Sequence, residues 1–292
     1  MSDTTKGIWL MVLAMFLFNK ADAFIKLVSV QVSFGQIMAS MGLLGAILTL
    51  TYTWSQGRIP LRREMLHPAL MWRVAGEVFG SCAIFIALAR SDLSLVSAIV
   101  QASPILIAVA AAVLLKEAVG WRRWTSIIVG FVGVLLIVNP FGADFDPNSI
   151  FAVIALIGLT IRDFSARFVP RTITSVEMTS VGAIGLFLGG LVVMALEGRA
   201  VVPDLKHGAF LVSGIVLAMG GAIAIGAGMR MGDVSAVAPF RYSRMIFAVS
   251  LGFIAFGERP TPLMWLGIAL VMGSGLFLLL RQRALHQAGA KV

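Results

Sequence analysis

The chain has 292 residues, of which 59% are hydrophobic and only 13% are charged. A soluble globular domain has about half apolar and about a quarter charged residues. This composition, with a mean hydropathy of +0.96, excludes an ordinary soluble domain and predicts an integral membrane protein. The formal net charge of +9 does not by itself indicate nucleic-acid binding, because membrane proteins carry lysine and arginine in their cytoplasmic loops.

Apolar segments follow one another along the chain, and each has about the ~20 residues that a helix needs to cross ~30 Å of hydrocarbon. Charged residues, prolines and glycines separate them. Several segments contain charges, which is typical of helices that line a polar interior. The ten predicted spans cover residues 7–28, 33–54, 70–90, 94–115, 120–139, 149–168, 174–196, 207–229, 234–256 and 261–280.

The second half of the chain repeats the first at a constant offset of 141 residues. One aligned pair is uninformative, but a single gap-free offset that aligns helices, loops and charged residues together indicates an internal duplication. We therefore predict two five-helix repeats, residues 7–140 and 148–281. The aligned pairs include Asp22 with Asp163, Gly80 with Gly221, Asp92 with Asp233, Glu117 with Glu258, and Trp124 with Trp265.

Because each repeat has an odd number of spans, the second repeat must enter the membrane from the opposite side. Inverted repeats recur in secondary transporters, whose substrate site lies near the bilayer midplane between the halves. The expected fold is therefore an all-α integral membrane protein with ten transmembrane helices arranged as two inverted five-helix repeats. If the N-terminus is inside, most of the 23 lysines and arginines fall in cytoplasmic segments. Both termini are thus predicted to be cytoplasmic.

Charged residues inside the predicted spans mark the candidate site. A charge at the bilayer centre costs roughly 2.5–3.5 kcal/mol on insertion scales, so such residues are expected to face a cavity or a partner. At ~1.5 Å per residue, four of them reach a similar depth in the cytoplasmic half, which predicts a polar cluster of Glu77, Arg162, Asp163 and Arg241. Alternatively, Arg241 pairs with Glu77 or with a backbone carbonyl as a purely structural contact.

Arg244 is the leading candidate for contact with a substrate. It lies one turn deeper than Arg241 on the same helix face, near the midplane, and no carboxylate is expected at its depth. An unpaired guanidinium fits the two oxygens of a carboxylate. Tyr242 adds a ring and a hydroxyl nearby, and Asn19, one turn before Asp22, brings a polar stripe into the first span.

Two spans that correspond between the repeats contain a proline, Pro104 in one and Pro239 in the other. Proline frees a backbone carbonyl and bends the helix, which a membrane tolerates where a cavity or a neighbour satisfies the freed group. Gln101 and Ser103 are therefore predicted to line the site opposite Arg244. The alternative is that these two side chains form hydrogen bonds between helices.

Two acid–base pairs are predicted to act as gates. Asp22 with Lys26 and Asp163 with Arg167 are spaced i, i+4 with the acid first, which is the favoured order on a helix. Inversion puts one pair near each mouth, where it can break and form as access alternates. The alternative is a pair of helix-surface salt bridges, each contributing a few tenths of a kcal/mol.

Several classes of function lack their sequence signature. The chain has no phosphate-binding G-x-x-x-x-G-K-[ST] loop, no metal-ligating cluster of histidine and cysteine, and no G-x-S-x-G or H-E-x-x-H motif. We therefore expect neither an enzyme nor a bound cofactor or metal. A channel would have a continuous aqueous path and would not show saturable exchange. Proton coupling would use Asp22, Glu77 or Asp163 as the titrating carboxylate, whereas a facilitator needs none.

Two stretches resemble the EamA repeats of the drug/metabolite transporter superfamily. They are "LSLVSAIVQASPILIAVAAAVLLKEAVGWRRWTSIIVGFVGVLLIV" and "DVSAVAPFRYSRMIFAVSLGFIAFGERPTPLMWLGIALVMGSGLFLL". In each, a helix ends in an acidic residue, Glu117 or Glu258, before a short loop, a tryptophan and a Gly-rich helix. The resemblance covers essentially the whole chain. It implies ten helices, cytoplasmic termini and alternating access in the bacterial inner membrane.

Within the superfamily the chain is similar to YddG-like amino acid exporters and to S-adenosylmethionine uptake carriers, whose "APYRY"-type stretch resembles "APFRY" here. Export of amino acids, including aromatic ones, and of related small metabolites is the expected function, with uptake or exchange of S-adenosylmethionine or another metabolite as the alternative. The expected partners are a zwitterionic small molecule and the lipid bilayer, with no nucleic acid, and the chain is expected as a monomer or homodimer. The candidate site residues are Arg244, Arg241, Tyr242, Glu77, Asn19, Gln101 and Ser103 for substrate, and Asp22, Lys26, Asp163 and Arg167 for gating.

Overall fold

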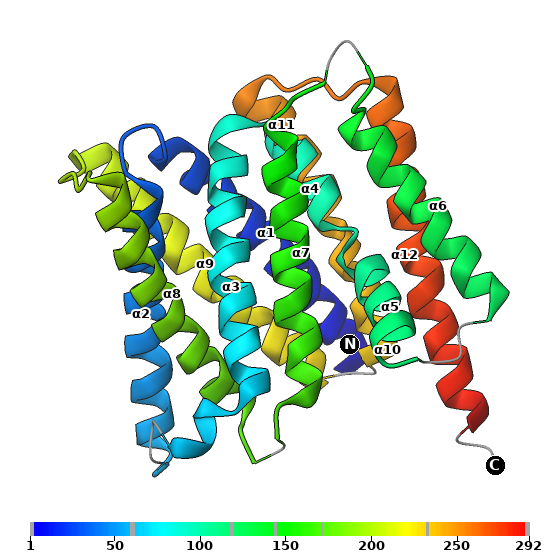
Figure 1. The fold of residues 1–292 in the computed structure, drawn as a ribbon, viewed down its shortest axis with the longest axis horizontal. Helices are drawn as coiled ribbons and strands as arrows, with labels where there is room; N and C mark the ends of the chain where they lie inside the picture. Colours follow the sequence, from blue (N-terminus) through cyan, green and yellow to red (C-terminus); the bar gives the residue numbers. More distant parts are fainter. Residues whose placement is uncertain are drawn as a thin grey trace. The chain divides into compact units, whose positions relative to one another are not determined.

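A computed structural model describes residues 3–58, 62–116, 120–142, 145–170, 172–231 and 234–289, without the side chains of residues 123, 230, 234–235 and 281–289. Every regular element in this part of the chain is a helix (Figure 1). The predicted all-α class is therefore confirmed. Glu117, which the sequence analysis places at a helix end, lies outside the described residues.

Twelve α-helices and three short 3₁₀ segments make up the described chain. The 3₁₀ segments are η1 (Arg63–Leu66), η2 (Ala166–Phe168) and η3 (Ala238–Tyr242). The α-helices are α1 (Asp3–Val28), α2 (Phe34–Ser55), α3 (Pro68–Arg90), α4 (Leu93–Val100), α5 (Ser103–Leu114), α6 (Trp121–Val138), α7 (Ser149–Ser165), α8 (Ser175–Glu197), α9 (Leu205–Met231), α10 (Val234–Val237), α11 (Ser243–Phe256) and α12 (Pro262–Gly289).

Each of the ten predicted spans contains helix, but not every span is a single helix long enough to cross a membrane. Among the described residues, 8 helices are long and apolar enough to cross a membrane, with α4 and α5 counted together as Leu93–Leu114. Trp124–Val138 is a shorter apolar helix. The predicted span 234–256 is divided into α10, η3 and α11. The count of ten crossings therefore stays a prediction.

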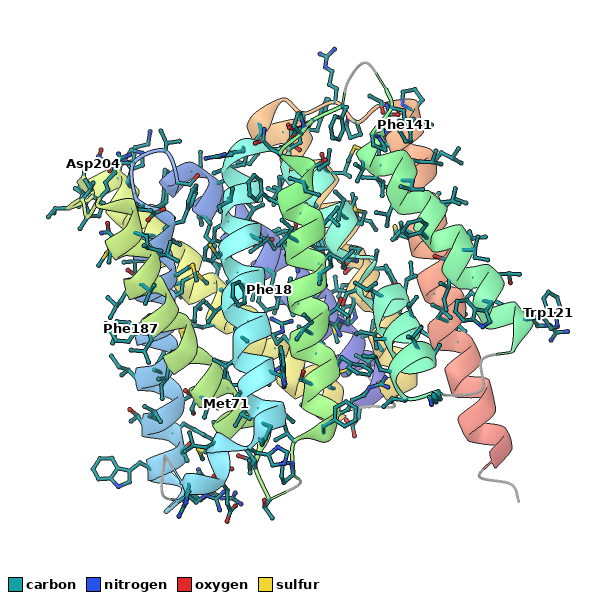
Figure 2. All side chains as sticks on the ribbon, in the orientation of Figure 1. Phe18, Met71, Trp121, Phe141, Phe187 and Asp204 are labelled. Atoms are coloured by element: carbon teal, nitrogen blue, oxygen red, sulfur yellow. The ribbon has the colours of Figure 1, made fainter. Side chains whose placement is uncertain are left out.

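Large apolar side chains are exposed along many helices (Figure 2). Trp121 on α6 is 71% exposed, and Phe141 after the same helix is fully exposed. Exposed apolar area on this scale is rare in soluble monomers, whereas lipid covers it in a bilayer. The chain is accordingly a multi-pass membrane protein.

The chain forms two compact units. The first contains Met1–Ala23, Ser91–Ser149 and Val216–Val292, and the second contains Phe24–Arg90 and Ile150–Ile215. Each unit combines segments from both predicted repeats. The compact units and the sequence repeats are therefore two different divisions of the chain.

In the second unit, α2 packs closely against α8 through glycines. A Cβ added at Gly42 would lie 2.2 Å from the Phe187 nitrogen, and one added at Gly190 would lie 2.3 Å from the Ala39 nitrogen. Residue numbers rise along α2 as they fall along α8, so the two helices are antiparallel. They are also repeat partners at the offset of 141 residues, and an inverted repeat requires this opposite direction.

In the first unit, α6 and α12 lie side by side (Figure 1). A Cβ added at Gly267 would lie 2.6 Å from the Gly133 carbonyl oxygen, and the Ser126 hydroxyl donates to the Ser274 carbonyl at 2.9 Å. The offset of 141 residues converts Gly133 into Ser274 and Ser126 into Gly267. The two contacts therefore exchange with each other, as expected for antiparallel repeat partners about a pseudo-two-fold axis.

Candidate functional site

Two spans of the first unit are interrupted at the positions that the sequence marks with proline. α4 ends at Val100 and α5 begins at Ser103, with Pro104 in its first turn. In the other span, η3 contains Pro239 and connects α10 to α11. The Gln101 side chain, between α4 and α5, donates through Nε2 to the Arg241 carbonyl at 3.2 Å. For Gln101 the structure thus shows the hydrogen bond between helices that was the alternative to lining the site.

An ion pair joins Arg244, at the start of α11, to Asp22 of α1. The Arg244 Nη2 donates to the Asp22 Oδ2 at 2.6 Å, and the two side chains are only 19% and 13% exposed. The expectation that Arg244 has no carboxylate at its depth is therefore wrong. The depth estimate counted only the backbone rise of a continuous α-helix, whereas η3 rises ~2.0 Å per residue and the long Arg244 side chain reaches well beyond its own backbone.

Asn19 connects the same two helices from one turn earlier on α1. Its side chain is fully buried, and Nδ2 donates to the carbonyl oxygens of Met15 at 3.0 Å and of Arg244 at 2.9 Å. The Asn19 Oδ1 atom has no hydrogen-bond partner among the described residues. The first span thus presents a carboxylate and an unused amide oxygen on one helix face, because residues i and i+3 are neighbours there.

Buried polar atoms that lack a partner in the described part of the chain gather at predicted substrate-binding residues. An unsatisfied buried polar atom costs about 1–3 kcal/mol, so each such atom calls for a specific explanation. Half of the 8 such atoms belong to four predicted residues of the first unit. These atoms are Asn19 Oδ1, Ser103 Oγ, Tyr242 Oη and Arg244 Nε.

Aromatic rings lie next to the Asp22–Arg244 pair. The Arg244 guanidinium carbon is 6.0 Å from the centroid of the Phe18 ring. Phe247, one turn after Arg244, makes an edge-to-face contact with Phe16 at 5.3 Å between centroids. The quadrupole of an aromatic ring attracts a cation that lies beside its face. The Phe18 ring therefore helps to stabilise the Arg244 guanidinium in its apolar surroundings.

Tyr242 is buried at the end of η3, and its hydroxyl lies against α12. A Cβ added at Gly275 would lie only 1.7 Å from the Tyr242 hydroxyl oxygen. The tyrosine therefore occupies its position because residue 275 has no side chain.

The second unit contains a charged cluster of its own. Arg162 of α7 donates to the Asp163 Oδ1 from Nε at 2.8 Å and to the Glu77 Oε1 from Nη1 at 3.3 Å. Arg73 of α3 donates to the Arg162 carbonyl at 3.4 Å. Three of the four residues predicted to form a polar cluster are thus in contact, while Arg241 belongs to the first unit and is exposed.

Three of the four predicted gating residues contact residues other than their predicted partner in the described part of the chain. Asp163 pairs with Arg162, and the Arg167 guanidinium lies 5.8 Å from the Phe164 ring. No ion pair joins Asp163 to Arg167 in the described part of the chain. Asp22 pairs with Arg244. The role of these residues in gating stays a prediction.

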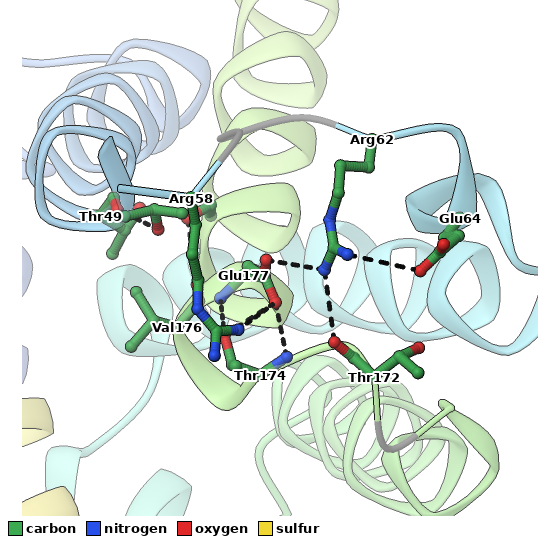
Figure 3. Close-up of polar contacts among 10 residues, drawn as sticks. Thr49, Arg58, Arg62, Glu64, Thr172, Thr174, Val176 and Glu177 are labelled. Atoms are coloured by element: carbon green, nitrogen blue, oxygen red, sulfur yellow. Dashed lines mark hydrogen bonds and ion pairs between the residues drawn. The ribbon is translucent and has the colours of Figure 1, made fainter. Parts of the chain in front are cut away.

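Glu177, at the start of α8, is a buried carboxylate whose hydrogen bonds are accounted for locally (Figure 3). It accepts from the Thr174 backbone nitrogen at 2.7 Å and from Arg62 Nη2 at 2.9 Å, and Thr174 in turn caps the helix. This capping box satisfies the free N–H groups of the first turn. Glu177 is therefore a structural residue.

Glu258, the acidic residue of the family pattern, caps a helix of the first unit. It accepts from the backbone nitrogens of Leu93 at 2.6 Å and Ser94 at 3.0 Å, and from the Ser94 hydroxyl at 2.7 Å. A carboxylate at a helix N-terminus is favourable because free N–H groups and the helix dipole meet there. The repeat identifies this acid in the sequence, but the sequence does not show which helix the acid caps.

Part of the chain matches a known protein family. Residues 5–139 match the EamA-like transporter family. The resemblance to EamA transporters is confirmed. The matched residues 5–139 nearly coincide with the first of the two predicted repeats, residues 7–140.

Three curated relatives have related names. The riboflavin transporter of Vibrio cholerae is 25% identical over 195 residues, and the S-adenosylmethionine uptake transporter of Rickettsia bellii is 25% identical over 184 residues. Each alignment covers 62% of this EamA-like chain and 60% or 61% of the relative, so the chain matches about three fifths of the length of these two proteins. The pseudopaline exporter CntI of Pseudomonas aeruginosa is 25% identical over 276 residues, which cover 91% of this chain and 93% of the exporter.

One solved structure, described as "Crystal structure of protein", superposes with a TM-score of 0.61. The superposition covers 94% of this chain and 96% of the other at 17% sequence identity. At this identity the similarity shows a shared fold and carries no information about the substrate.

Proposed function

We propose that this EamA-like protein is a secondary transporter of the bacterial inner membrane that exports amino acids, including aromatic ones, and related small metabolites by alternating access. The observation that carries the proposal is the buried Asp22–Arg244 ion pair next to an interrupted helix, with Arg244 Nε and Asn19 Oδ1 lacking a hydrogen-bond partner in the described part of the chain. Ionisable residues inside a membrane are expensive and mark substrate or ion sites by default. Interrupted helices at such a place are typical of transporter substrate sites.

The names of the relatives support transport of a small polar metabolite. One relative that aligns over nearly the whole chain is named as an exporter, which favours export. Uptake or exchange of S-adenosylmethionine is the second candidate, because several relatives carry that name and because "APFRY" forms η3 beside the ion pair. Both substrates combine a carboxylate with a positively charged group.

The proposal assigns substrate contact to the first unit. Within the described residues, Arg244 and Asn19 present an unused donor and an unused acceptor, and Tyr242 and Ser103 present hydroxyls without partners. Gln101 connects the two interruptions through its hydrogen bond to the Arg241 carbonyl. The remaining candidates are assigned less specific roles. Arg241 and Glu77 are polar neighbours of the pathway, and Asp22, Lys26, Asp163 and Arg167 are gating residues that exchange partners as access alternates.

Counterflow in proteoliposomes tests the function. The panel contains radiolabelled neutral and aromatic amino acids, S-adenosylmethionine, riboflavin, a sugar and a cationic drug. Saturable exchange of amino acids is the expected result. Exchange of S-adenosylmethionine without amino acids would transfer the assignment to the second candidate. Riboflavin, sugar or drug exchange alone would contradict both, and non-saturable flux would indicate a channel.

A further inference from the structure

The Asp22–Arg244 pair is electrically neutral and mostly buried. A ligand with one charge that opened the pair would leave the opposite protein charge without a partner in surroundings of low dielectric constant, which is strongly unfavourable. A ligand that carries both charges leaves neither protein charge uncompensated. The geometry therefore discriminates between ligands by their charge pattern.

We propose that a zwitterionic substrate inserts between Asp22 and Arg244, so that its carboxylate binds Arg244 and its ammonium group binds Asp22. This inference rests on the proposed function and specifies the substrate chemistry of the same site. In the ion pair, each of the two side chains takes the place that one end of the substrate occupies in the complex.

The unused hydrogen-bonding atoms fit the two ends of such a ligand. Arg244 donates to Asp22 through Nη2 alone, and its buried Nε has no partner in the described part of the chain. Nε and Nη of one guanidinium form the fork that a carboxylate accepts with both oxygens. On α1, Asn19 Oδ1 is a buried acceptor with no partner in that same part, one turn from Asp22. An ammonium group has three donors to share between these oxygens.

The surroundings also indicate what the substrate carries besides its charges. Phe18 lies beside the guanidinium, and the Phe16–Phe247 pair adjoins it on the two helices that hold the ion pair. Aromatic rings stack well on other rings. The site is therefore suited to an amino acid with an apolar or aromatic side chain.

Three ligands of nearly the same shape test the inference: phenylalanine, 3-phenylpropionate, which lacks the ammonium group, and 2-phenylethylamine, which lacks the carboxylate. Binding of each to the purified full-length protein in detergent is measured by calorimetry. The proteins are the wild type, Asp22→Asn and Arg244→Gln. The variants Asp22→Asn/Arg244→Gln and Arg63→Gln, at an exposed site of η1, are the matched controls.

The wild type is expected to bind phenylalanine at least tenfold more tightly than either singly charged ligand. Asp22→Asn should shift the preference at least tenfold toward 3-phenylpropionate, and Arg244→Gln should shift it toward 2-phenylethylamine. Arg63→Gln should bind like the wild type. This reversal of sign between two variants is a readout that loss of stability alone does not produce.

Equal losses for all three ligands in folded, monodisperse single variants would overturn the inference, as would a wild type that ignores ligand charge. If a single variant does not fold, the double variant, which has no unpaired charge, remains testable and must lose the preference for phenylalanine. Counterflow that is specific for an uncharged substrate would contradict the proposed function. A charge preference that reverses without any amino acid counterflow would contradict the function and keep the inference.

Discussion

At the scale of single residues, the charges inside the spans define the site. The sequence identifies Asp22, Asn19 and Arg244 as unusual because they interrupt apolar runs. It does not identify them as one group, because Asp22 and Arg244 are 222 positions apart and depth counted along each helix is insensitive to a 3₁₀ segment. The sequence also does not show which buried polar atoms lack a hydrogen-bond partner, because the partners come from distant parts of the chain.

Removing one member of the Asp22–Arg244 pair should destabilise the protein more than removing both. Each of Asp22→Asn and Arg244→Gln leaves a buried charge alone and is expected to cost about 3–5 kcal/mol. The double variant leaves no unpaired charge and should therefore cost less than either single variant. Denaturant unfolding in detergent measures these values. Additive losses would mean that the two residues do not stabilise each other.

At the scale of helices, the apolar runs predicted the positions of the helices well. Every predicted span contains helix, and α2 and α8 begin within a residue of their predicted starts. The division of 234–256 into α10, η3 and α11 was not predicted. Pro239 signalled a bend, but the length of the 3₁₀ segment depends on packing, which periodicity does not encode.

The repeat predicts where a helix end is strained. Lys116, after α5, has a positive φ of 51°, and its repeat partner Gly257, after α11, has a φ of 67°. A left-handed residue at a helix end favours glycine because it has no Cβ. Lys116→Gly should therefore stabilise the protein by about 0.5–1 kcal/mol, while Gly257→Lys should destabilise it. Thermal unfolding in detergent measures both, and a loss of stability in Lys116→Gly would contradict the account.

Close helix contacts make particular glycines indispensable. Gly42→Ala places a Cβ 2.2 Å from the Phe187 nitrogen, and backbone is unable to move aside as a flexible side chain does. We expect a loss of at least about 1–3 kcal/mol, as for overpacked cores. Gly226→Ala, whose Cβ meets nothing within 4 Å, is the control and should be neutral or stabilising. Equal unfolding temperatures for the two variants would show that α2 and α8 do not pack this closely.

At the scale of the whole molecule, sequence and structure divide the chain differently. The offset of 141 residues gives two consecutive repeats, whereas the contacts give units that draw on both. Repeat partners such as α6 and α12 pack against each other, and chain order alone does not reveal which helices meet. The contacts that exchange under the offset support the inverted arrangement, which remains a prediction.

The charge distribution predicts that both termini are cytoplasmic. A C-terminal fusion should therefore give fluorescent green fluorescent protein and inactive alkaline phosphatase, because the phosphatase needs the oxidising periplasm. Fusion after Arg90, in a segment predicted to be outside, is the matched control and should give active phosphatase. The reverse pattern would invert the whole arrangement and contradict the proposed topology.

The most direct test of the account is phenylalanine counterflow in proteoliposomes that contain wild-type protein, Arg244→Gln or the exposed-site control Arg63→Gln. The account predicts saturable exchange by the wild type and the control, and at least a tenfold loss in Arg244→Gln at equal amounts of folded protein. Undiminished exchange by Arg244→Gln would contradict the claim that Arg244 binds the substrate.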